Sequence, residues 1–352
     1  MRKSGDRFGT HRVVSPVGVL PQQAEKLDTA LPIYENELLI DVDCLNIDSA
    51  SFHQIKEVCG ADPLKMQNHF LEIIQKRGKQ HNPVTGSGGM LIGRVKEVGP
   101  KFLEGRPKED VITEGDKIAT LVSLTLTPLY LAKITKVHLD TDKLDVSGHA
   151  ILFQSGIYAK LPNDISETEA LAILDVAAAP AQTAAMCKKG QTVVVIGAGG
   201  KSGMLCCYEA KKKVGPTGRV IGLDYGQAAL ELMKKLSFID ASEFCDARDA
   251  VKTHQTVKRL SNGELADICI NTANIPDTEM ACVLSVKPGG TAYFFNMATS
   301  FTKATLGSEG VGSDATLIMG NGYRPGHAEY ALNILRQSKE IREIFRSKYG
   351  AS

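Results

Sequence analysis

The sequence predicts an α/β protein in which a β-rich domain is followed by a doubly wound parallel sheet. Two observations indicate this organisation. The first part of the chain has alternating apolar and polar residues and glycine-punctuated apolar runs, which are typical of antiparallel strands and their turns. After residue 163, short apolar runs alternate with helical patterns, as in parallel strands joined by helical crossovers.

The first part of the chain contains strand patterns interrupted by one helical region. Residues 36–48 alternate at period two and predict a half-buried strand. Residues 55–77 predict a helix, with a break at Asp62–Pro63 because the residue before a proline avoids helical geometry. Residues 85–100 and 114–139 predict further short strands. We therefore expect a twisted, largely antiparallel β-domain.

The second part of the chain alternates strand and helix patterns. Its predicted strands cover residues 191–198, 219–224, 243–246, 266–273 and 289–297. Its predicted helices cover residues 199–215, 226–237, 247–261 and 276–285. The tail, residues 326–350, predicts one amphipathic helix. Such alternation is typical of a doubly wound sheet.

Composition excludes several classes of partner. The 352 residues include 41 Lys plus Arg and 40 Asp plus Glu, so no net field favours nucleic acid or an anionic membrane. The chain has no run of about 18 apolar residues, and its first residues lack the apolar core of a secretory signal. We therefore expect a cytoplasmic protein without a nucleic-acid or membrane partner.

A glycine-rich run at residues 193–203, VVVIGAGGKSG, allows two interpretations. Its Gly-Lys-Ser resembles the phosphate-binding loop of ATP- or GTP-hydrolysing proteins, which needs another glycine five residues before that of Gly-Lys-Ser. The chain has Val195 there, a β-branched residue within a predicted strand, so it cannot form the required turn.

The same run fits a dinucleotide-binding turn, which needs a strand, a tight glycine turn and a helix. Gly197 and Gly199 supply the turn and the close approach to pyrophosphate. The third glycine is expected at position 202, where the chain has Ser202, and Gly203 follows one residue later. The shift predicts an altered turn, in which Lys201 and Ser202 are free to contact the pyrophosphate and Gly200 is part of the loop.

An acidic residue and three polar residues complete the predicted cofactor site. Asp224 ends the next predicted strand, where a carboxylate can bind both ribose hydroxyls of the adenosine. It favours NAD over NADP because a 2′-phosphate would lie against a like charge, and NADP is the less favoured alternative. Thr272 and Asn274 follow the apolar run ADICIN and Asn296 ends the run TAYFFN, at the sheet edge where cofactors bind in open α/β folds.

The order of these motifs resembles the medium-chain dehydrogenase/reductase superfamily. The matching stretches are NELLIDVDCLNID, GGMLIGRVKEVG, EGDKIATL, LPNDISETEALAILDVAAAPAQTAA and VKPGGTAYFF. The resemblance implies a GroES-like catalytic domain formed by residues 1–163 and 320–352, and a Rossmann domain formed by residues 164–319. It also implies a homo-oligomer, a dimer or a tetramer.

The superfamily resemblance also bears on metal binding. In its alcohol-dehydrogenase branch a catalytic zinc takes Cys, His and Cys, and the corresponding positions here are Asp48, Gly89 and Asp175. Glycine has no ligand atom, and two carboxylates alone make a poor zinc site. The closely spaced cysteines of a structural zinc site are missing from residues 100–116. We therefore expect a zinc-independent enzyme with no metal ligands.

The whole chain further resembles a narrower family of amino dehydrogenases of bacterial lysine fermentation. The stretches that carry this resemblance are FGTHRVVSPVGVLPQQAEKLD, IQKRGKQHNPVTGSGGMLIGRV, VVVIGAGGKSGMLCCYEAKKKVG and GSEGVGSDATLIMGNGYRPGHAEYALNILR. The resemblance implies NAD-dependent oxidative deamination of a small diamino acid, with release of ammonia. Two alternatives stay open: a zinc-independent quinone-type reductase that uses NAD(P)H, and a non-catalytic dinucleotide-binding protein of the same fold.

Such a reaction needs a base, because an ammonium group cannot release hydride. The candidates are Asp175, Asp48 and His53, which the motif alignment places near the zinc-equivalent positions, followed by Tyr158. Asp175 and Asp48 are also candidates to bind the two amino groups, although Asp175 could instead cap a local turn.

The substrate carboxylate needs a cation. Arg324 and Lys201 are the candidates. Lys201 could instead bind the cofactor phosphates or lie in solvent.

Overall fold

The computed structural model describes residues 3–106, 111–320 and 322–349, which form two compact units. The first unit comprises residues 1–167 and the second residues 168–352. No helix within the described ranges combines the length and the apolar character needed to cross a membrane.

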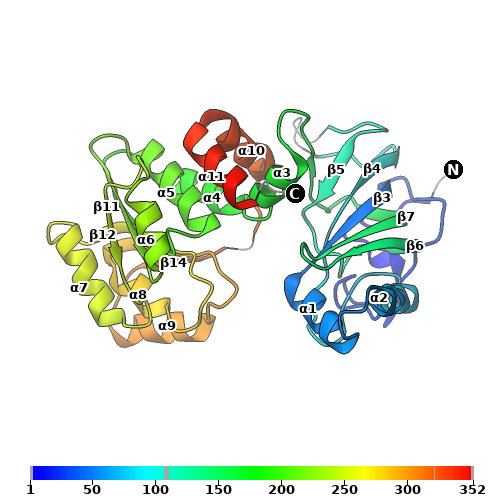
Figure 1. Cartoon of the computed structure of the whole chain (residues 1–352), viewed down its shortest axis with the longest axis horizontal. Coiled ribbons are helices and arrows are strands. Elements are labelled where there is room, and N and C mark those ends of the chain that lie inside the picture. Colours follow the sequence, from blue (N-terminus) through cyan, green and yellow to red (C-terminus); the bar gives the residue numbers. More distant parts are fainter. Residues whose placement is uncertain (1–2, 107–110, 321, 350–352) are drawn as a thin grey trace. The chain divides into compact units, whose positions relative to one another are not determined.

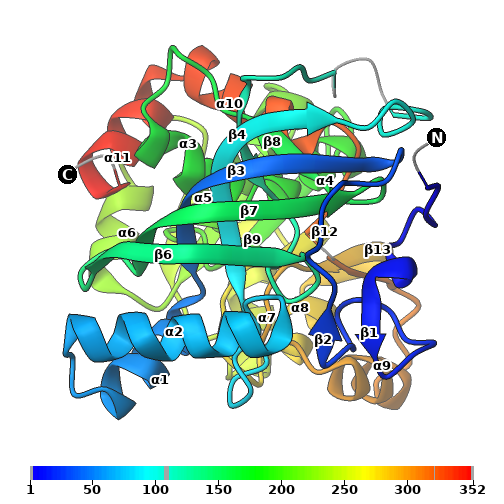
Figure 2. The same ribbon diagram turned by 90° about the vertical axis from the view of Figure 1, so that its right-hand side faces the viewer.

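The first unit is built on an antiparallel sheet of six strands, which confirms the predicted β-domain. Its strands are β3 (Glu37–Ile47), β4 (Gly89–Val98), β5 (Lys117–Thr120), β6 (Leu129–His138), β7 (Lys143–Phe153) and β8 (Tyr158–Lys160). They are arranged in the order β6-β7-β3-β4-β5-β8, with β3 paired along its length to β4 and β7. Figure 2 shows β3, β7 and β6 side by side.

Two helices connect β3 to β4. The helices α1 (Ser49–Val58) and α2 (Pro63–Arg77) are separated at the predicted break, where the Asp62 side chain caps α2. Proline stands at the start of α2, where its missing N–H costs nothing. Helix α2 packs against β6 (Figure 2) and buries Met66 and Phe70 in the core of the unit.

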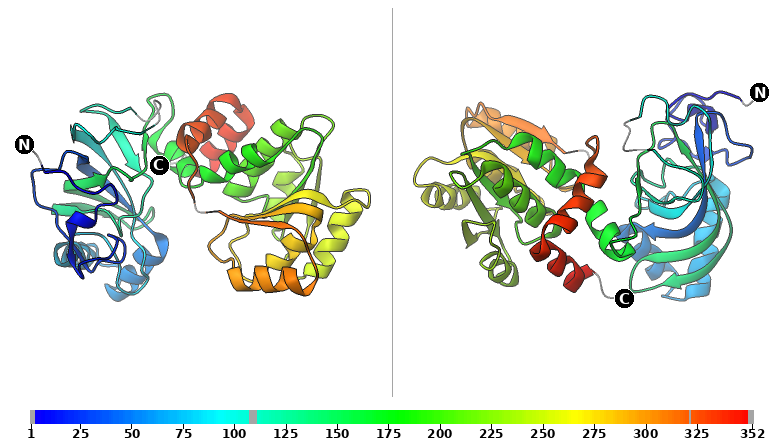
Figure 3. Two further views of the ribbon diagram at one scale, coloured as in Figure 1. Left: turned by 180° about the vertical axis from the view of Figure 1, so that it is seen from behind. Right: turned by 90° about the horizontal axis from the view of Figure 1, so that it is seen from above.

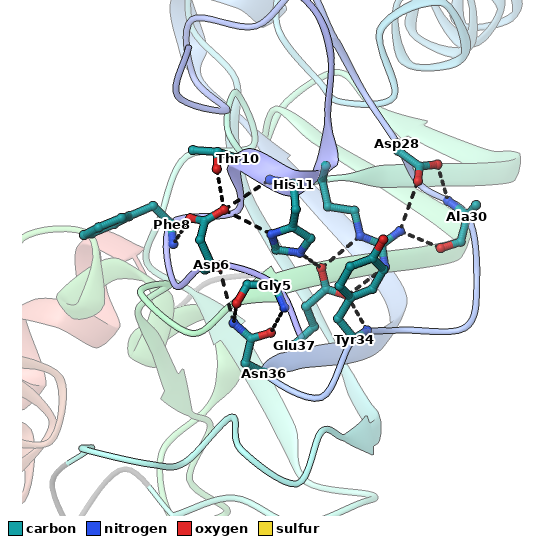
Figure 4. Close-up of polar contacts among 11 residues, drawn as sticks. Gly5, Asp6, Phe8, Thr10, His11, Asp28, Ala30, Tyr34, Asn36 and Glu37 are labelled. Atoms are coloured by element: carbon teal, nitrogen blue, oxygen red, sulfur yellow. Dashed lines mark hydrogen bonds and ion pairs between the residues drawn. The ribbon is translucent and has the colours of Figure 1, made fainter. Parts of the chain in front are cut away.

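The N-terminal segment of the first unit contains a buried charge cluster, shown in Figure 4. The segment includes a short 3-10 helix, η1 (Thr10–Arg12), and a small ribbon of β1 (Val13–Ser15) and β2 (Lys26–Leu27). Arg12 and Glu37 are 1% and 0% exposed, and the guanidinium donates two hydrogen bonds to the carboxylate, at 2.9 and 2.7 Å.

Three further groups complete this buried charge cluster. The Nε2 atom of His11 lies 2.8 Å from the same Glu37 carboxylate, the guanidinium of Arg12 also donates to the carbonyl of Ala30, and it lies over the ring of Tyr34. Burial alone would raise the pKa of Glu37, but the hydrogen bonds from His11 and Arg12 lower it to about 2.

The second unit contains a parallel sheet of six strands in the order β11-β10-β9-β12-β13-β14. The strands are β9 (Thr192–Ile196), β10 (Arg219–Asp224), β11 (Ala241–Phe244), β12 (Ala266–Asn271), β13 (Val286–Phe294) and β14 (Thr316–Met319). The order reverses direction between β9 and β12, which is the topology of a dinucleotide-binding doubly wound sheet. The fold class predicted from the sequence is therefore confirmed.

Helices cover both faces of this sheet, as Figures 1 and 3 show. The helices on one side are α4 (Ala178–Met186), α5 (Lys201–Val214) and α6 (Gln227–Met233). Those on the other side are α7 (Ala250–Leu260), α8 (Glu279–Leu284) and α9 (Phe301–Gly310). Crossovers that run outward from β9 in opposite directions along the sheet must place their helices on opposite faces.

The C-terminal segment differs from its prediction in two ways. It forms two helices, α10 (His327–Gln337) and α11 (Lys339–Tyr349), because Ser338 is extended and its hydroxyl accepts a hydrogen bond from the backbone N–H of Ile341. The structure assigns these helices to the second unit, whereas the family resemblance assigned residues 320–352 to the catalytic domain. The apolar face of α10 packs against α4.

Candidate functional site: a dinucleotide turn and two carboxylates

The glycine turn after β9 requires glycine at its first and last positions. Gly197 has a φ of +81°, which L side chains rarely adopt. A Cβ atom on Gly203 would lie 2.1 Å from the carbonyl oxygen of Gly197, so only glycine lets α5 start this close to the strand. Gly203 therefore takes the packing role that the motif normally gives to position 202. Val195 lies inside β9 and is fully buried, as predicted.

The N-terminus of α5 offers an anion-binding position. Gly200 is the N-cap residue, and no side chain of the described residues caps the helix there. The first backbone N–H groups of a helix have no partner within it, and they attract phosphate groups. Ser202 is half-buried in this first turn. The turn has a shape and polarity that fit a pyrophosphate.

Asp224 stands at the carboxyl end of β10, next to the glycine turn. One oxygen of its carboxylate accepts a hydrogen bond from the Gly199 N–H at 2.9 Å, and the other accepts one from the Gly226 N–H at 3.1 Å. A carboxylate can accept about four hydrogen bonds, so both oxygens keep capacity for ribose hydroxyls. Asp224 thus also fixes the turn, a role that the sequence motif did not predict.

An aromatic residue that the motif search missed follows Asp224. Tyr225 is 56% exposed, and its ring lies 5.1 Å from that of Phe244. The guanidinium of Arg248 lies 5.6 Å from the Tyr225 ring and donates two hydrogen bonds to the carboxylate of Asp246. The sequence signal for this exposed ring is an aromatic residue directly after the acidic residue at the strand end.

The three polar residues predicted at the sheet edge have different surroundings. The Thr272 hydroxyl donates to the carbonyl of Ile196 at 2.9 Å, so it ties the glycine turn to the end of β12. Asn274 is exposed in the loop that follows. The Asn296 amide donates to the carbonyl of Asn271 at 3.3 Å. All three lie after strand ends of the second unit.

Asp175 and Lys201 form an ion pair in the second unit. The ammonium of Lys201 lies 2.6 Å from the carboxylate of Asp175, with the side chains 23% and 57% exposed. Asp175 lies in the turn between α3 (Glu167–Leu174) and α4, while its neighbours Leu174 and Val176 are buried. Lys201 is the first residue of α5, so the pair ties this turn to the glycine loop.

Arg324 lies between β14 and α10, and its guanidinium donates a hydrogen bond to the side chain of Gln182 at 2.8 Å. This contact orients the guanidinium from α4.

The first unit holds the other three candidates. Asp48 is the N-cap of α1: its exposed carboxylate accepts hydrogen bonds from the Ala50 N–H and the Ser87 hydroxyl, both at 3.1 Å. His53 is exposed on α1 and its Nδ1 atom lies 2.8 Å from the carbonyl oxygen of Ser49. Neither set of contacts blocks access from solvent.

Tyr158 has a packing role. It is 6% exposed, its ring stacks on Phe102 at 6.1 Å, and the guanidinium of Arg106 lies 5.0 Å from its ring. These contacts belong to the hydrophobic core of the first unit. A catalytic role for Tyr158 stays a prediction.

That the enzyme is zinc-independent and has no metal ligands stays a prediction. Within residues 3–106, 111–320 and 322–349, no three His, Cys, Asp or Glu side chains gather as metal ligands would. Asp48 lies in the first unit and Asp175 in the second, and each is bonded to a neighbour in its own unit.

The β-rich unit and the parallel sheet with its dinucleotide turn have the architecture of the medium-chain dehydrogenase/reductase class. The fold is similar to that of an alcohol dehydrogenase from Thermotoga maritima, with a TM-score of 0.53 at 15% identity over 89% of this chain and 85% of that one. Residues 11–162 match the family model of the L-erythro-3,5-diaminohexanoate dehydrogenase N-terminal domain.

Two curated relatives define the family more closely. The chain is 53% identical to an L-erythro-3,5-diaminohexanoate dehydrogenase from Acetoanaerobium sticklandii, over 98% of this chain and 99% of the relative. It is 50% identical to a protein of the same name from Fusobacterium nucleatum, over 99% of both chains. The chain belongs to the L-erythro-3,5-diaminohexanoate dehydrogenase family, and it is a dehydrogenase that uses a nicotinamide cofactor.

Proposed function

We propose that the protein catalyses the NAD-dependent oxidative deamination of (3S,5S)-3,5-diaminohexanoate to 5-amino-3-oxohexanoate, with release of ammonia. The observation that carries this proposal is the identity of 53% over 98% of the chain to a relative named for this substrate. Such a reaction fits the anaerobic lysine degradation that the sequence resemblance implies.

The reaction balances with one water molecule. The substrate ammonium, NAD⁺ and water give the ketone, NADH, an ammonium ion and a proton. A nicotinamide cofactor held at the glycine turn would supply the acceptor for the hydride of C3. The protein must first take a proton from the C3 ammonium, because only the neutral amine has the electron pair that expels hydride, and it must then deprotonate the water that attacks the imine.

The turn and Asp224 support NAD as the cofactor. The N-terminus of α5, where no side chain of the described residues caps the helix, suits the pyrophosphate, and the Asp224 carboxylate suits two ribose hydroxyls. A 2′-phosphate would add negative charge beside this carboxylate. Arg248, the cation near Tyr225, is already bonded to Asp246 through two hydrogen bonds. Tyr225 offers a flat exposed ring beside Asp224 for the adenine.

Asp175 is our candidate for the proton acceptor. Its carboxylate is 57% exposed and pairs with Lys201, so a substrate ammonium could replace the lysine without leaving a buried carboxylate unpaired. That Asp48 and Arg324 bind substrate groups stays a prediction. A proton-relay role for His53 stays a prediction, as do the cytoplasmic location and the homo-oligomer.

The test of the catalytic role compares two exposed aspartates that each form an ion pair with a lysine. Asp175→Asn should lower kcat by about 10²- to 10⁴-fold, as expected for a general base, while the KM for NAD stays unchanged. Asp41→Asn is the matched control, because Asp41 pairs with Lys96 at 2.9 Å on the first-unit sheet. Equal activity of the two variants would remove Asp175 from the chemistry.

The test of the reaction class uses the rival substrate. Purified enzyme with NAD and 3,5-diaminohexanoate should form NADH, whereas a quinone-type reductase would oxidise NADPH when a quinone is added. Turnover with the quinone alone would contradict the proposal, and cofactor binding without any turnover would favour the non-catalytic alternative.

A further inference from the structure

The last residue of β12 is a buried polar residue in an otherwise apolar strand end. Residues 268–270 are buried and apolar, and Asn271, which follows them, is 0% exposed. Strands buried on both faces of a parallel sheet are normally apolar, because a buried polar group costs free energy unless hydrogen bonds replace those it made to water. The amide of Asn271 therefore needs partners, and its partners identify the segment that it organises.

Asn271 lies at the edge of the sheet that carries the glycine turn. In the register of the sheet it is paired with Ile196, the last residue of β9, and with Phe294, the last residue of β13. Ligands of doubly wound sheets bind outside the carboxyl ends of the strands, where the strand order reverses, and here that point lies between β9 and β12. The bonds of Asn271 can therefore act on the loops around this point.

The Asn271 side chain is bonded to two places in the loop that follows it, residues 272–278. Its amide nitrogen donates to the Thr278 hydroxyl at 2.8 Å, and its amide oxygen accepts a hydrogen bond from the Ala273 N–H at 3.1 Å. The Thr278 hydroxyl in turn donates to the carbonyl of Ile275 at 3.4 Å. One buried amide thus joins the beginning and the end of the loop.

The same loop is tied to the segments on both sides of it. The Thr272 hydroxyl donates to the carbonyl of Ile196 at 2.9 Å, directly before the glycine turn. The backbone carbonyl of Asn271 accepts hydrogen bonds from the Phe295 N–H at 2.8 Å and from the Asn296 amide at 3.3 Å. The loop is therefore fixed between the glycine turn and the segment that follows β13.

The exposed side chains of the loop are distinct from those that hold it. Asn274 is exposed and Ile275 is 38% exposed, whereas Asn271 and Thr278 are buried. A ligand at this edge of the sheet can contact the first two side chains, and the buried pair sets the shape of the loop before the ligand arrives. A loop that is already held in its bound shape loses less conformational freedom on binding, which favours affinity.

We infer that Asn271 is a positioning residue for the cofactor: through Thr278 and Ala273 it holds residues 272–278 as a wall of the dinucleotide site. The inference rests on the proposed function, in which NAD binds at the glycine turn, and it adds a residue that acts on the cofactor only through the loop. Loosening the loop should weaken NAD binding and leave kcat at saturating NAD unchanged.

The test replaces Thr278, because an apolar residue at position 271 would leave two partners unpaired. Thr278→Val keeps the shape of the side chain and removes the hydroxyl that contacts Asn271 and Ile275. The Kd for NAD, measured by calorimetry, should rise about two- to tenfold, as expected for the loss of one hydrogen bond between neutral groups. Thr278→Ser keeps the hydroxyl and should bind NAD like the wild type.

Ser285 provides a matched control at the other end of α8. Its side chain is 0% exposed, and its hydroxyl donates to the carbonyl of Ala281 at 2.6 Å. Its carbonyl accepts a hydrogen bond from the N–H of Ala266, the first residue of β12, so it lies at the opposite edge of the sheet. Ser285→Ala should lower the Tm and leave the Kd for NAD unchanged.

Three results would overturn the inference. The first is an unchanged Kd for NAD in Thr278→Val, which would leave its hydroxyl a structural role only. The second is binding by Thr278→Ser that is as weak as that by Thr278→Val. The third is an equal rise of the Kd in Ser285→Ala, which would show that any loss of stability weakens NAD binding.

Calorimetry separates this inference from the proposed function, because NAD binding is measured without substrate. If NAD binds but 3,5-diaminohexanoate is not oxidised, the proposed reaction fails, and weaker NAD binding by Thr278→Val would still support the role of Asn271. If the wild type binds no NAD, the cofactor proposal and this inference are both overturned.

Discussion

Each unit contains an ion pair, and the two pairs differ in burial and in the number of bonds that hold them. Arg12 and Glu37 are buried, and the pair is held by further bonds to His11 and Ala30 (Figure 4). Asp175 is 57% exposed and forms an ion pair with Lys201. A buried pair with many bonds cannot exchange partners cheaply, whereas an exposed pair can release its carboxylate to a ligand.

The largest expected effect comes from breaking the buried pair. Arg12→Met should lower the free energy of unfolding by about 3–5 kcal/mol, because it leaves the Glu37 carboxylate buried without its main partner. Urea denaturation measures this change. Lys201→Met, which breaks the exposed pair, should cost less than about 1 kcal/mol.

If Arg12→Met does not fold, the double variant Arg12→Met/Glu37→Met still tests how the buried pair affects the free energy of unfolding. Replacing both partners by apolar side chains removes the unpaired charge, so the double variant should be more stable than Arg12→Met. If the double variant is less stable than the single one, the buried pair is not the source of the effect.

Acid should unfold the first unit through the same cluster. The folded pKa of Glu37 is about 2, against 4.5 for an unperturbed glutamate. Asp6, whose carboxylate lies 3.2 Å from the Nδ1 atom of His11, also has a pKa of about 2. A lowered pKa gives stability that is complete above the unfolded value and is lost as the pH falls through the folded one. Unfolding free energies should therefore fall between about pH 4.5 and about pH 2.

His11 makes the free energy of unfolding depend on pH in the opposite direction, at higher pH. Burial lowers its pKa, but the hydrogen bonds to Glu37 and Asp6 raise it above the ordinary value of 6.5 overall. Its contribution to stability is complete below pH 6.5 and is lost as the pH rises through the raised pKa. His11→Gln should flatten this alkaline slope, and an unchanged slope would show that other groups cause it.

The sequence predicted the parts of the molecule that depend on local rules. Gly197 and Asp224 were identifiable because the turn geometry and the strand end each restrict the residue type, and Val195 excluded the phosphate-binding loop of nucleotide hydrolases for the same reason. The family resemblance also indicated the substrate class, because the motifs that carry it extend through most of the chain.

Contacts between distant residues were not predictable. The Arg12–Glu37 pair joins residues 25 positions apart and the Lys201–Asp175 pair joins residues 26 apart, and no periodicity links them. Asn271 also gave no signal, because its partners are visible only once the loop is folded. The break at Ser338 was missed because the apolar pattern continues across it.

In the second unit, a change of moderate size is expected in the preference for NAD over NADP when Asp224 is replaced. Asp224→Ala should raise the KM for NAD by about tenfold or more, through the loss of hydrogen bonds to the ribose, while the KM for NADP changes little or falls because a like charge is removed. Initial rates with both cofactors measure this. Equal losses would mean that Asp224 acts through its bond to Gly199 instead.

The smallest effect concerns the exposed pair itself. A double-mutant cycle with Lys201→Met and Asp175→Asn should give a coupling free energy below about 1 kcal/mol for unfolding. Thermal or urea unfolding of the four proteins measures it. A coupling of several kcal/mol would show that the pair is part of the folded scaffold, and would contradict the partner exchange proposed for Asp175.

The most direct test of the account is the stoichiometry of the reaction. Enzyme, NAD and 3,5-diaminohexanoate are mixed, and NADH is followed by absorbance while ammonia is measured in the same samples. The account predicts one NADH and one ammonia for each diamino acid consumed. NADH without ammonia, or no NADH with this substrate while NADPH is oxidised by a quinone, would contradict it.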